Sequence, residues 1–259
     1  VGDAWPPEPR PAGPPATTSR RVVPWGLRDA VGAFVAFVLA ASVLGGVVLV
    51  VLRPRAPSLA DAVSLPLSLA LLALSVVAWV AVRYPGHVRA LFGRARPGRR
   101  DVAVGAGTGL AAFFVISVGF GGLLQLLVRL LERELPPVQQ ELQQLARDPG
   151  TAPLLLIGAA VAAPLAEELF FRGMLYPALR NRLPPWPAIG LSALAFAGTH
   201  FQDSLDGYLL VVLFIFPLGM MLAWLYERRG TIVVPMLAHA VYNLVQVMLL
   251  IGAVPFATR

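Results

Sequence analysis

The chain alternates between long hydrophobic runs and short polar connections. A transmembrane helix needs about 20 predominantly apolar residues, and about seven runs approach or exceed that length. They cover approximately residues 30–52, 62–82, 102–128, 152–179, 186–201, 208–226 and 231–251. The pattern therefore predicts an all-α fold, a polytopic membrane bundle of about seven transmembrane helices.

The polar segments divide the chain into three regions. Residues 1–24 are rich in proline and cannot bury a core, which predicts a disordered tail. Residues 25–149 hold the first membrane helices, and residues 150–252 form a helical core that carries the candidate chemistry. Between residues 130 and 148, apolar side chains recur at helical spacing among Glu and Gln, which predicts an amphipathic helix lying along the membrane interface. They are Leu135, Val138, Leu142 and Leu145.

The composition agrees with a membrane protein and excludes several kinds of site. Of 259 residues, 57% are hydrophobic and 14% are charged, against roughly 25% charged residues in a soluble domain. The absence of cysteine excludes disulfides and thiolate metal sites. We therefore expect an integral membrane protein in contact with lipid.

The net charge of +7 comes from arginine alone, because the chain has no lysine. The arginines lie between the hydrophobic runs and are densest in residues 83–101. This is the positive-inside pattern, so we expect a cytoplasmic N-terminus and no nucleic-acid partner. The use of Arg in place of Lys, together with many Ala and Pro residues, indicates a GC-rich bacterium and hence a bacterial plasma membrane.

Two adjacent carboxylates and an arginine interrupt the apolar segment 154–179. An ionised group at such depth costs ~2.5–3.5 kcal/mol, so these side chains face a protein interior and usually mark function. Glu168 and Arg172 are four residues apart on one helix face, which predicts an ion pair. Glu167 points about a quarter-turn away and remains free to act as a general base.

Two other runs supply polar partners at a similar depth in the membrane. His200 follows Phe196 by four residues, and His239 and Asn243 share one face of the last run. His87 lies in the Arg-rich loop, where we expect it to be solvated. The pattern favours one site built from three helices.

Peptide hydrolysis is the chemistry that these residue types favour. Glu167 and a histidine can deprotonate a water molecule, and a second histidine with Asn243 can donate hydrogen bonds to the oxyanion of an attacked amide. A covalent nucleophile is disfavoured, because no embedded Ser has an obvious activating base. This scheme needs no cofactor.

Zinc is the alternative, held by Glu167, His200 and His239 as a His₂Glu set. The His-Glu-x-x-His string typical of zinc peptidases is absent, so the spacing does not argue for a metal.

Three motifs together resemble the CPBP family, the CAAX-protease and bacteriocin-processing group also called ABI, which includes the type II CAAX prenyl endopeptidases. They are Glu167-Glu168-x-x-x-Arg172, Phe196-x-x-x-His200 and His239-x-x-x-Asn243. The resemblance covers about residues 150–250. It implies an intramembrane endopeptidase for peptides or membrane proteins, lipidated or not, with a chamber that opens toward the cytoplasm and laterally to lipid.

The resemblance also implies a role for each motif residue. Glu167 and His200 would activate water, His239 and Asn243 would stabilise the oxyanion, and the Glu168–Arg172 pair would order the site. Two other function classes remain open. A proton- or cation-coupled transporter predicts broken helices or internal repeats, and a non-catalytic membrane immunity or scaffold protein would keep the polar core for packing.

Overall fold

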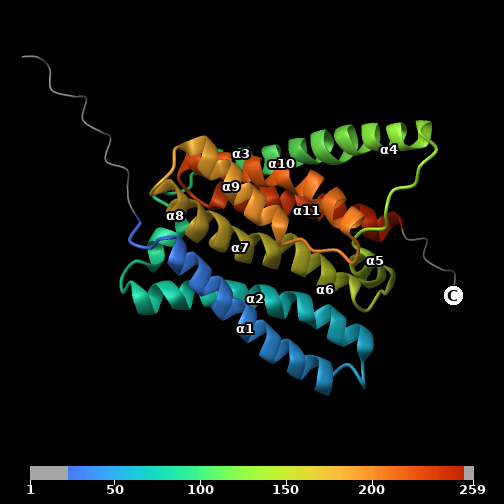
Figure 1. The fold of residues 1–259 in the computed structure, drawn as a ribbon, viewed down its shortest axis with the longest axis horizontal. Helices are drawn as coiled ribbons and strands as arrows, with labels where there is room; N and C mark the ends of the chain where they lie inside the picture. Colours follow the sequence, from blue (N-terminus) through green and yellow to red (C-terminus); the bar gives the residue numbers. More distant parts are fainter. Residues whose placement is uncertain (1–22, 254–259) are drawn as a thin grey trace, which may run out of the picture.

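The computed structural model describes residues 23–253, and every regular element in that part of the chain is a helix (Figure 1). Six of these helices are long and apolar enough to cross a membrane, which confirms an all-α polytopic membrane bundle. They are α1 (Leu27–Val51), α2 (Pro57–Arg83), the continuous helix Arg99–Leu130, the continuous helix Ala152–Arg180, α10 (Leu205–Arg229) and α11 (Val233–Ala253). Residues 1–22 of the predicted tail lie outside the described residues.

Both continuous helices contain stretches of wider, π-helical winding. The first consists of α3 (Arg99–Ala112), η2 (Phe113–Phe120) and α4 (Gly121–Leu130). The second consists of α6 (Ala152–Ile157), η3 (Gly158–Ala162), α7 (Ala163–Glu168), η4 (Leu169–Leu175) and α8 (Tyr176–Arg180). Such π-bulges are frequent at functional sites, and two of them flank α7, which carries both glutamates.

The run at residues 186–201 is not a full transmembrane helix. It forms α9 (Pro185–Gly198), whose 14 residues reach about 21 Å, short of a hydrocarbon core of about 30 Å. The non-helical segment 199–204 then carries the chain on to the start of α10 (Figure 1). Here the backbone N–H of Gln139 donates to Gln202 Oε1 at 2.8 Å. The predicted fifth crossing is therefore part helix and part non-helical chain.

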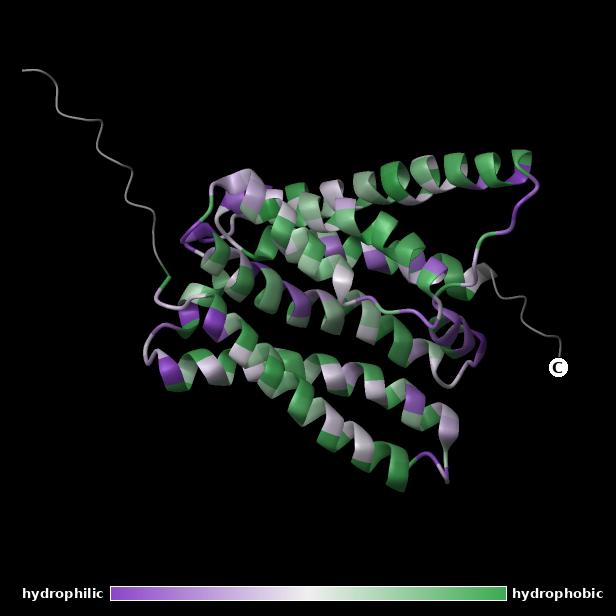
Figure 2. Cartoon of the chain, viewed as in Figure 1, coloured by the Kyte–Doolittle hydropathy of each residue, from purple (hydrophilic) through white to green (hydrophobic). Residues whose placement is uncertain are grey.

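The bundle has two ends with different composition. At the arginine-rich end, α2, α8 and α10 finish, and a β-bridge between Gly93 and Thr231 joins the α2–α3 and α10–α11 connections. At the opposite end, which we call the acidic end, α4 finishes and α6 and α10 begin. Figure 2 shows hydrophilic residues gathered at these two ends, with mainly hydrophobic helices between them.

The predicted interfacial helix is shorter than its apolar pattern suggested. Only α5 (Gln140–Arg147) is helical, so Leu142 and Leu145 lie on it while Leu135 and Val138 precede it. The two consecutive prolines at 136 and 137 explain the difference, since proline lacks a backbone N–H and disfavours helix in the residue before it. Leu145 is buried in a small cluster at the acidic end of the bundle.

Close packing of α3 on α11 positions the last motif. A Cβ built on Gly105 would lie 2.8 Å from the Val234 carbonyl, and one on Gly109 would collide with the Ala238 carbonyl. Small residues four apart allow such an approach between membrane helices. Gly107, by contrast, faces open space. The close approach of the two helices therefore occurs at Gly105 and Gly109.

The segment before α1 is anchored in the bundle. Trp25 is fully buried, and its indole N–H donates to the Met174 carbonyl at 3.2 Å. The side-chain amide of Asn181 donates to the carbonyls of Val23 and Trp25 at 3.2 and 3.1 Å. This segment therefore ties the start of α1 to η4 and α8.

Candidate active site

The structure brings Glu167, His200, His239 and Asn243 to one cavity of about 460 Å³. Glu167 comes from α7, His200 from the segment after α9, and the other two from α11. The sequence placed these residues on three separate membrane segments. The cavity is the feature that unites them.

Glu168 and Arg172 form the ion pair that their four-residue spacing predicts. Arg172 Nη1 donates to Glu168 Oε1 at 2.9 Å, and both side chains are fully buried. Arg172 Nη2 also donates to the Gly219 carbonyl on α10 at 2.9 Å. The guanidinium carbon lies 4.7 Å from the centre of the Phe196 ring, a cation–π contact. One arginine thus links the second continuous helix, α9 and α10.

His239 lies between the two glutamates, a contact that the spacing did not predict. Its Nδ1 is 3.1 Å from Glu168 Oε1, and its Nε2 is 3.9 Å from Glu167 Oε2. Because a carboxylate only accepts hydrogen bonds, we assign the hydrogen to Nδ1, which leaves Nε2 as an acceptor facing Glu167. A separation of 3.9 Å exceeds a direct hydrogen bond and suits a bridging water.

Glu167 differs sharply from its neighbour in the chain. Its side chain is 17% exposed, and its Oε2 is buried without a hydrogen-bond partner among the described residues. A buried carboxylate oxygen without a partner is costly. Glu167 therefore presents an acceptor into the cavity, whereas Glu168 is held by Arg172 and His239.

His200 is oriented by the helix end that precedes it. Its Nδ1 lies 2.9 Å from the Phe196 carbonyl, so Nδ1–H donates there and Nε2 remains for another partner. The Phe196 ring packs edge-on against both imidazoles, with centroid distances of 5.0 Å to His200 and 5.6 Å to His239. The Phe196 ring therefore lies in contact with both imidazole rings and helps to fix their positions.

Asn243 is held by a hydrogen bond to the Ala159 carbonyl, which Pro164 leaves without a backbone partner. In η3 the Ala163 N–H bonds to the Gly158 carbonyl, five residues back. The next residue, Pro164, has no N–H for the Ala159 carbonyl in the same register. Asn243 Nδ2 donates to that carbonyl at 2.9 Å. The amide therefore joins α11 to η3 while lining the cavity.

The donor geometry does not form a metal site. Within residues 23–253, no group of three His, Asp or Glu side chains is arranged to hold a metal ion. Glu167, His200 and His239, the set considered for zinc, share the cavity without forming such a group, and Nδ1 of His239 is already engaged with Glu168.

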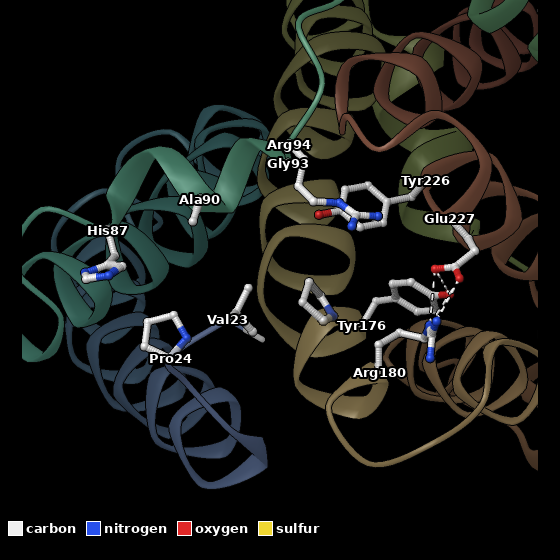
Figure 3. A pocket seen from close by; sticks show the side chains of 11 residues that line it. Val23, Pro24, His87, Ala90, Gly93, Arg94, Tyr176, Arg180, Tyr226 and Glu227 are labelled. Carbon is white, nitrogen blue, oxygen red and sulfur yellow. Dashed lines mark hydrogen bonds and ion pairs between the residues drawn. The ribbon is translucent and has the colours of Figure 1, made fainter. Parts of the chain in front are cut away.

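A second cavity, of about 340 Å³, lies at the arginine-rich end (Figure 3). Here Glu227 accepts hydrogen bonds from the Tyr176 hydroxyl at 2.8 Å and from Arg180 Nη2 at 3.0 Å. His87 also lines this cavity, far along the chain from the three motifs, and its Nδ1 is 3.1 Å from the Pro85 carbonyl. Because the carboxylate of Glu227 is paired, this network ties α8 to α10 and offers no free base. Sequence reasoning did not find it, since its members are 47 and 51 residues apart.

Comparison with known families found a match over the part of the chain that carries the candidate site. Residues 149–245 match the family model of type II CAAX prenyl endopeptidase Rce1-like proteins. This region is therefore similar to the CAAX-protease-like family. It includes all three motifs and runs from α6 into α11, whereas α1 to α5 lie outside the match. No curated protein and no solved structure matched the chain. The six apolar helices indicate an integral membrane protein, and residues 149–245 within it are similar to a CAAX-type protease family.

Proposed function

We propose that this chain is an intramembrane endopeptidase that hydrolyses peptide bonds of membrane-associated or lipidated polypeptides. The observation that carries the proposal is the Glu167 oxygen, which has no hydrogen-bond partner within residues 23–253 and faces a cavity shared with His200, His239 and Asn243. The match of residues 149–245 to a CAAX endopeptidase family supports the same reaction class.

In the proposed reaction, Glu167 and the free Nε2 of His239 hold a water molecule between them. Glu167 takes a proton as the water oxygen attacks the carbonyl carbon of the substrate. The tetrahedral oxyanion accepts a hydrogen bond from the Asn243 amide. The C–N bond then breaks, and Glu167 returns the proton to the leaving amine.

This scheme exchanges the roles that the resemblance implied for the two histidines. With Nδ1 donating to Glu168, neutral His239 presents an acceptor at Nε2, which suits holding water better than stabilising an oxyanion. His200 lines the same cavity and, in its protonated form, joins Asn243 as a donor to the oxyanion. Glu168 and Arg172 fix the orientation of His239 and the packing of the surrounding helices.

The test is the isosteric Glu167→Gln variant, purified and reconstituted with membrane-embedded peptides, prenylated and unprenylated. We expect cleavage to fall by about 10²–10⁴-fold while thermal unfolding in detergent is unchanged. Glu134→Gln, which alters an exposed carboxylate, is the matched control and should keep activity. Cleavage by Glu167→Gln at the wild-type rate would contradict the proposal, as would a wild-type protein that cleaves no peptide in the set.

One observation favours a second function. The fifth crossing is interrupted after α9, and interrupted helices are typical of transporter sites. A proton- or cation-coupled transporter therefore remains the alternative. Ion uptake by proteoliposomes that depends on Glu167, without peptide cleavage, would support it.

A further inference from the structure

The site cavity extends from Glu167 toward the acidic end of the bundle. Its lining includes Asn243, Gln246 and Leu250, which follow one another along α11 toward that end. Gln139 and Leu142, from the connection before α5 and from α5 itself, line its outer part. The cavity therefore opens beside α5.

A larger groove of about 740 Å³ adjoins this opening between α1, α2 and α5. Leu65 and Leu142 line both the groove and the site cavity, so the two spaces are neighbours. The groove also holds three carboxylates, from Asp61, Glu141 and Asp148. A polypeptide lying in this groove would reach the site from the acidic end.

Side chains fill the space between the arginine-rich end of the bundle and the site. Trp25, Leu91 and Met174 are fully buried on the arginine-rich side, and the Trp25 indole is bonded to the Met174 carbonyl. A Cβ on Gly173 would lie 2.7 Å from the Leu91 carbonyl, so the backbones also pack closely there. The cavity of Figure 3 shares no lining residue with the site cavity. Among the described residues, the arginine-rich side of the site is therefore closely packed around Trp25, Leu91 and Met174.

Charge distinguishes the two ends. The arginine-rich end carries Arg28, Arg83, Arg89, Arg94, Arg96, Arg99, Arg100, Arg180, Arg182, Arg228 and Arg229, with Asp29, Asp101 and Glu227 as its acids. The acidic end carries Asp61, Glu132, Glu134, Glu141, Asp148, Asp203 and Asp206, with Arg53, Arg55, Arg129, Arg133 and Arg147 as its bases. Arginine in short loops marks the cytoplasmic side of a membrane protein.

We propose that substrate reaches Glu167 from the extracytoplasmic side, through the acidic end. The substrate class is then a membrane-anchored polypeptide whose cleavable segment lies outside the cytoplasm. This places the opening on the opposite face from the cytoplasmic one that the family resemblance implied. The substrate class depends on the proposed peptidase function, whereas the side of the opening does not.

The cysteine-free chain allows a direct test of this orientation. Gln144→Cys, on α5 beside the groove, and Ala95→Cys, in the α2–α3 loop, both alter exposed residues and keep every charge. Intact bacterial cells producing each full-length variant are treated with a membrane-impermeant maleimide. We expect Gln144→Cys to react in intact cells and Ala95→Cys to react only after permeabilisation. The reverse pattern, or reaction of Gln144→Cys only after permeabilisation, would overturn the proposal.

Activity then separates this inference from the peptidase proposal. In intact cells, a bulky impermeant maleimide on Gln144→Cys should reduce cleavage of a membrane-anchored reporter at least tenfold, with no effect in the Ala95→Cys variant. Cleavage that continues in fully modified Gln144→Cys would overturn access through the acidic end. If labelling follows the expected pattern but the unmodified protein cleaves nothing, the orientation stands and the peptidase function fails.

Discussion

Two neighbouring glutamates occupy opposite environments. Each has a buried Oε2 without a partner among the described residues. Glu168 is completely buried and its Oε1 bonds to both Arg172 and His239, whereas Glu167 is partly exposed to the cavity. Adjacent residues on a helix point about 100° apart, so one peptide bond separates an ordering residue from the proposed base.

Removing Glu168 should be costly for stability. Glu168→Ala leaves the Arg172 guanidinium buried with only the Gly219 carbonyl as acceptor, and breaking a buried pair typically costs 3–5 kcal/mol. We expect a lower thermal unfolding temperature in detergent as well as lost cleavage. The double variant Glu168→Leu with Arg172→Met should regain much of the stability but no activity, because His239 still lacks its acceptor. Unchanged thermal stability of Glu168→Ala would rule out this account of the pair.

Chelation should leave cleavage intact. The proposed mechanism uses Glu167, His200, His239 and Asn243 directly, and these residues do not form a three-ligand metal group. We expect full activity after treatment with EDTA, and no stoichiometric zinc by elemental analysis. A zinc-dependent peptidase in the same buffer serves as the control for chelation. Activity that disappears and returns with added Zn²⁺, together with bound zinc, would favour the His₂Glu alternative.

At the scale of elements, the backbone of α3 sets the position of α11. Gly109 lies against the carbonyl of Ala238, the residue before His239. Any side chain at 109 must therefore push α11 away from α3, and the imidazole would move with it. This close approach connects a glycine outside the family match to the site.

Gly109→Ala and Gly107→Ala form a matched pair for this contact. Overpacking a close interface costs about 1–3 kcal/mol, so Gly109→Ala should lower both thermal stability and cleavage. Gly107→Ala faces open space and should change neither. Circular dichroism melts in detergent and the peptide assay provide both measurements. Equal behaviour of the two variants would show that the α3–α11 contact is unimportant.

At the scale of the whole molecule, the two ends differ in packing as well as in charge. The arginine-rich end is filled around Trp25, while the acidic end holds the groove and the cavity mouth. The interrupted crossing at residues 199–204 belongs to this open side. Non-helical backbone at membrane depth is tolerated where it is buried in protein or lines a cavity, and His200 in this segment lines the site.

Trp25 should be a major stabilising residue of the closed end. Trp25→Ala removes a fully buried indole, and such truncations cost about 3–5 kcal/mol. We expect a clear fall in the thermal unfolding temperature. Trp186→Ala is the control, because Trp186 on α9 is 64% exposed and should have little effect in detergent. Similar melting of Trp25→Ala and the wild type would contradict the packing role.

Local patterns were sufficient for much of this protein. Hydrophobic run length located six spanning helices, and helical spacing paired Glu168 with Arg172. The three motifs placed the candidate chemistry within residues 149–245, the region of the family match. These features depend on near neighbours in the chain, whose relation on a helix follows from its 3.6-residue turn.

The other features of the fold and the site depend on contacts between segments that are distant in the chain. They placed His239 on Glu168, 71 residues away, and Asn243 on Ala159, 84 residues away. They also set the end of α9 at Gly198, the closeness of Gly109 to α11, and the end at which the cavity opens. Helix rotation and crossing depend on packing against partners far along the chain, and hydrophobic periodicity carries no information about which partners those are.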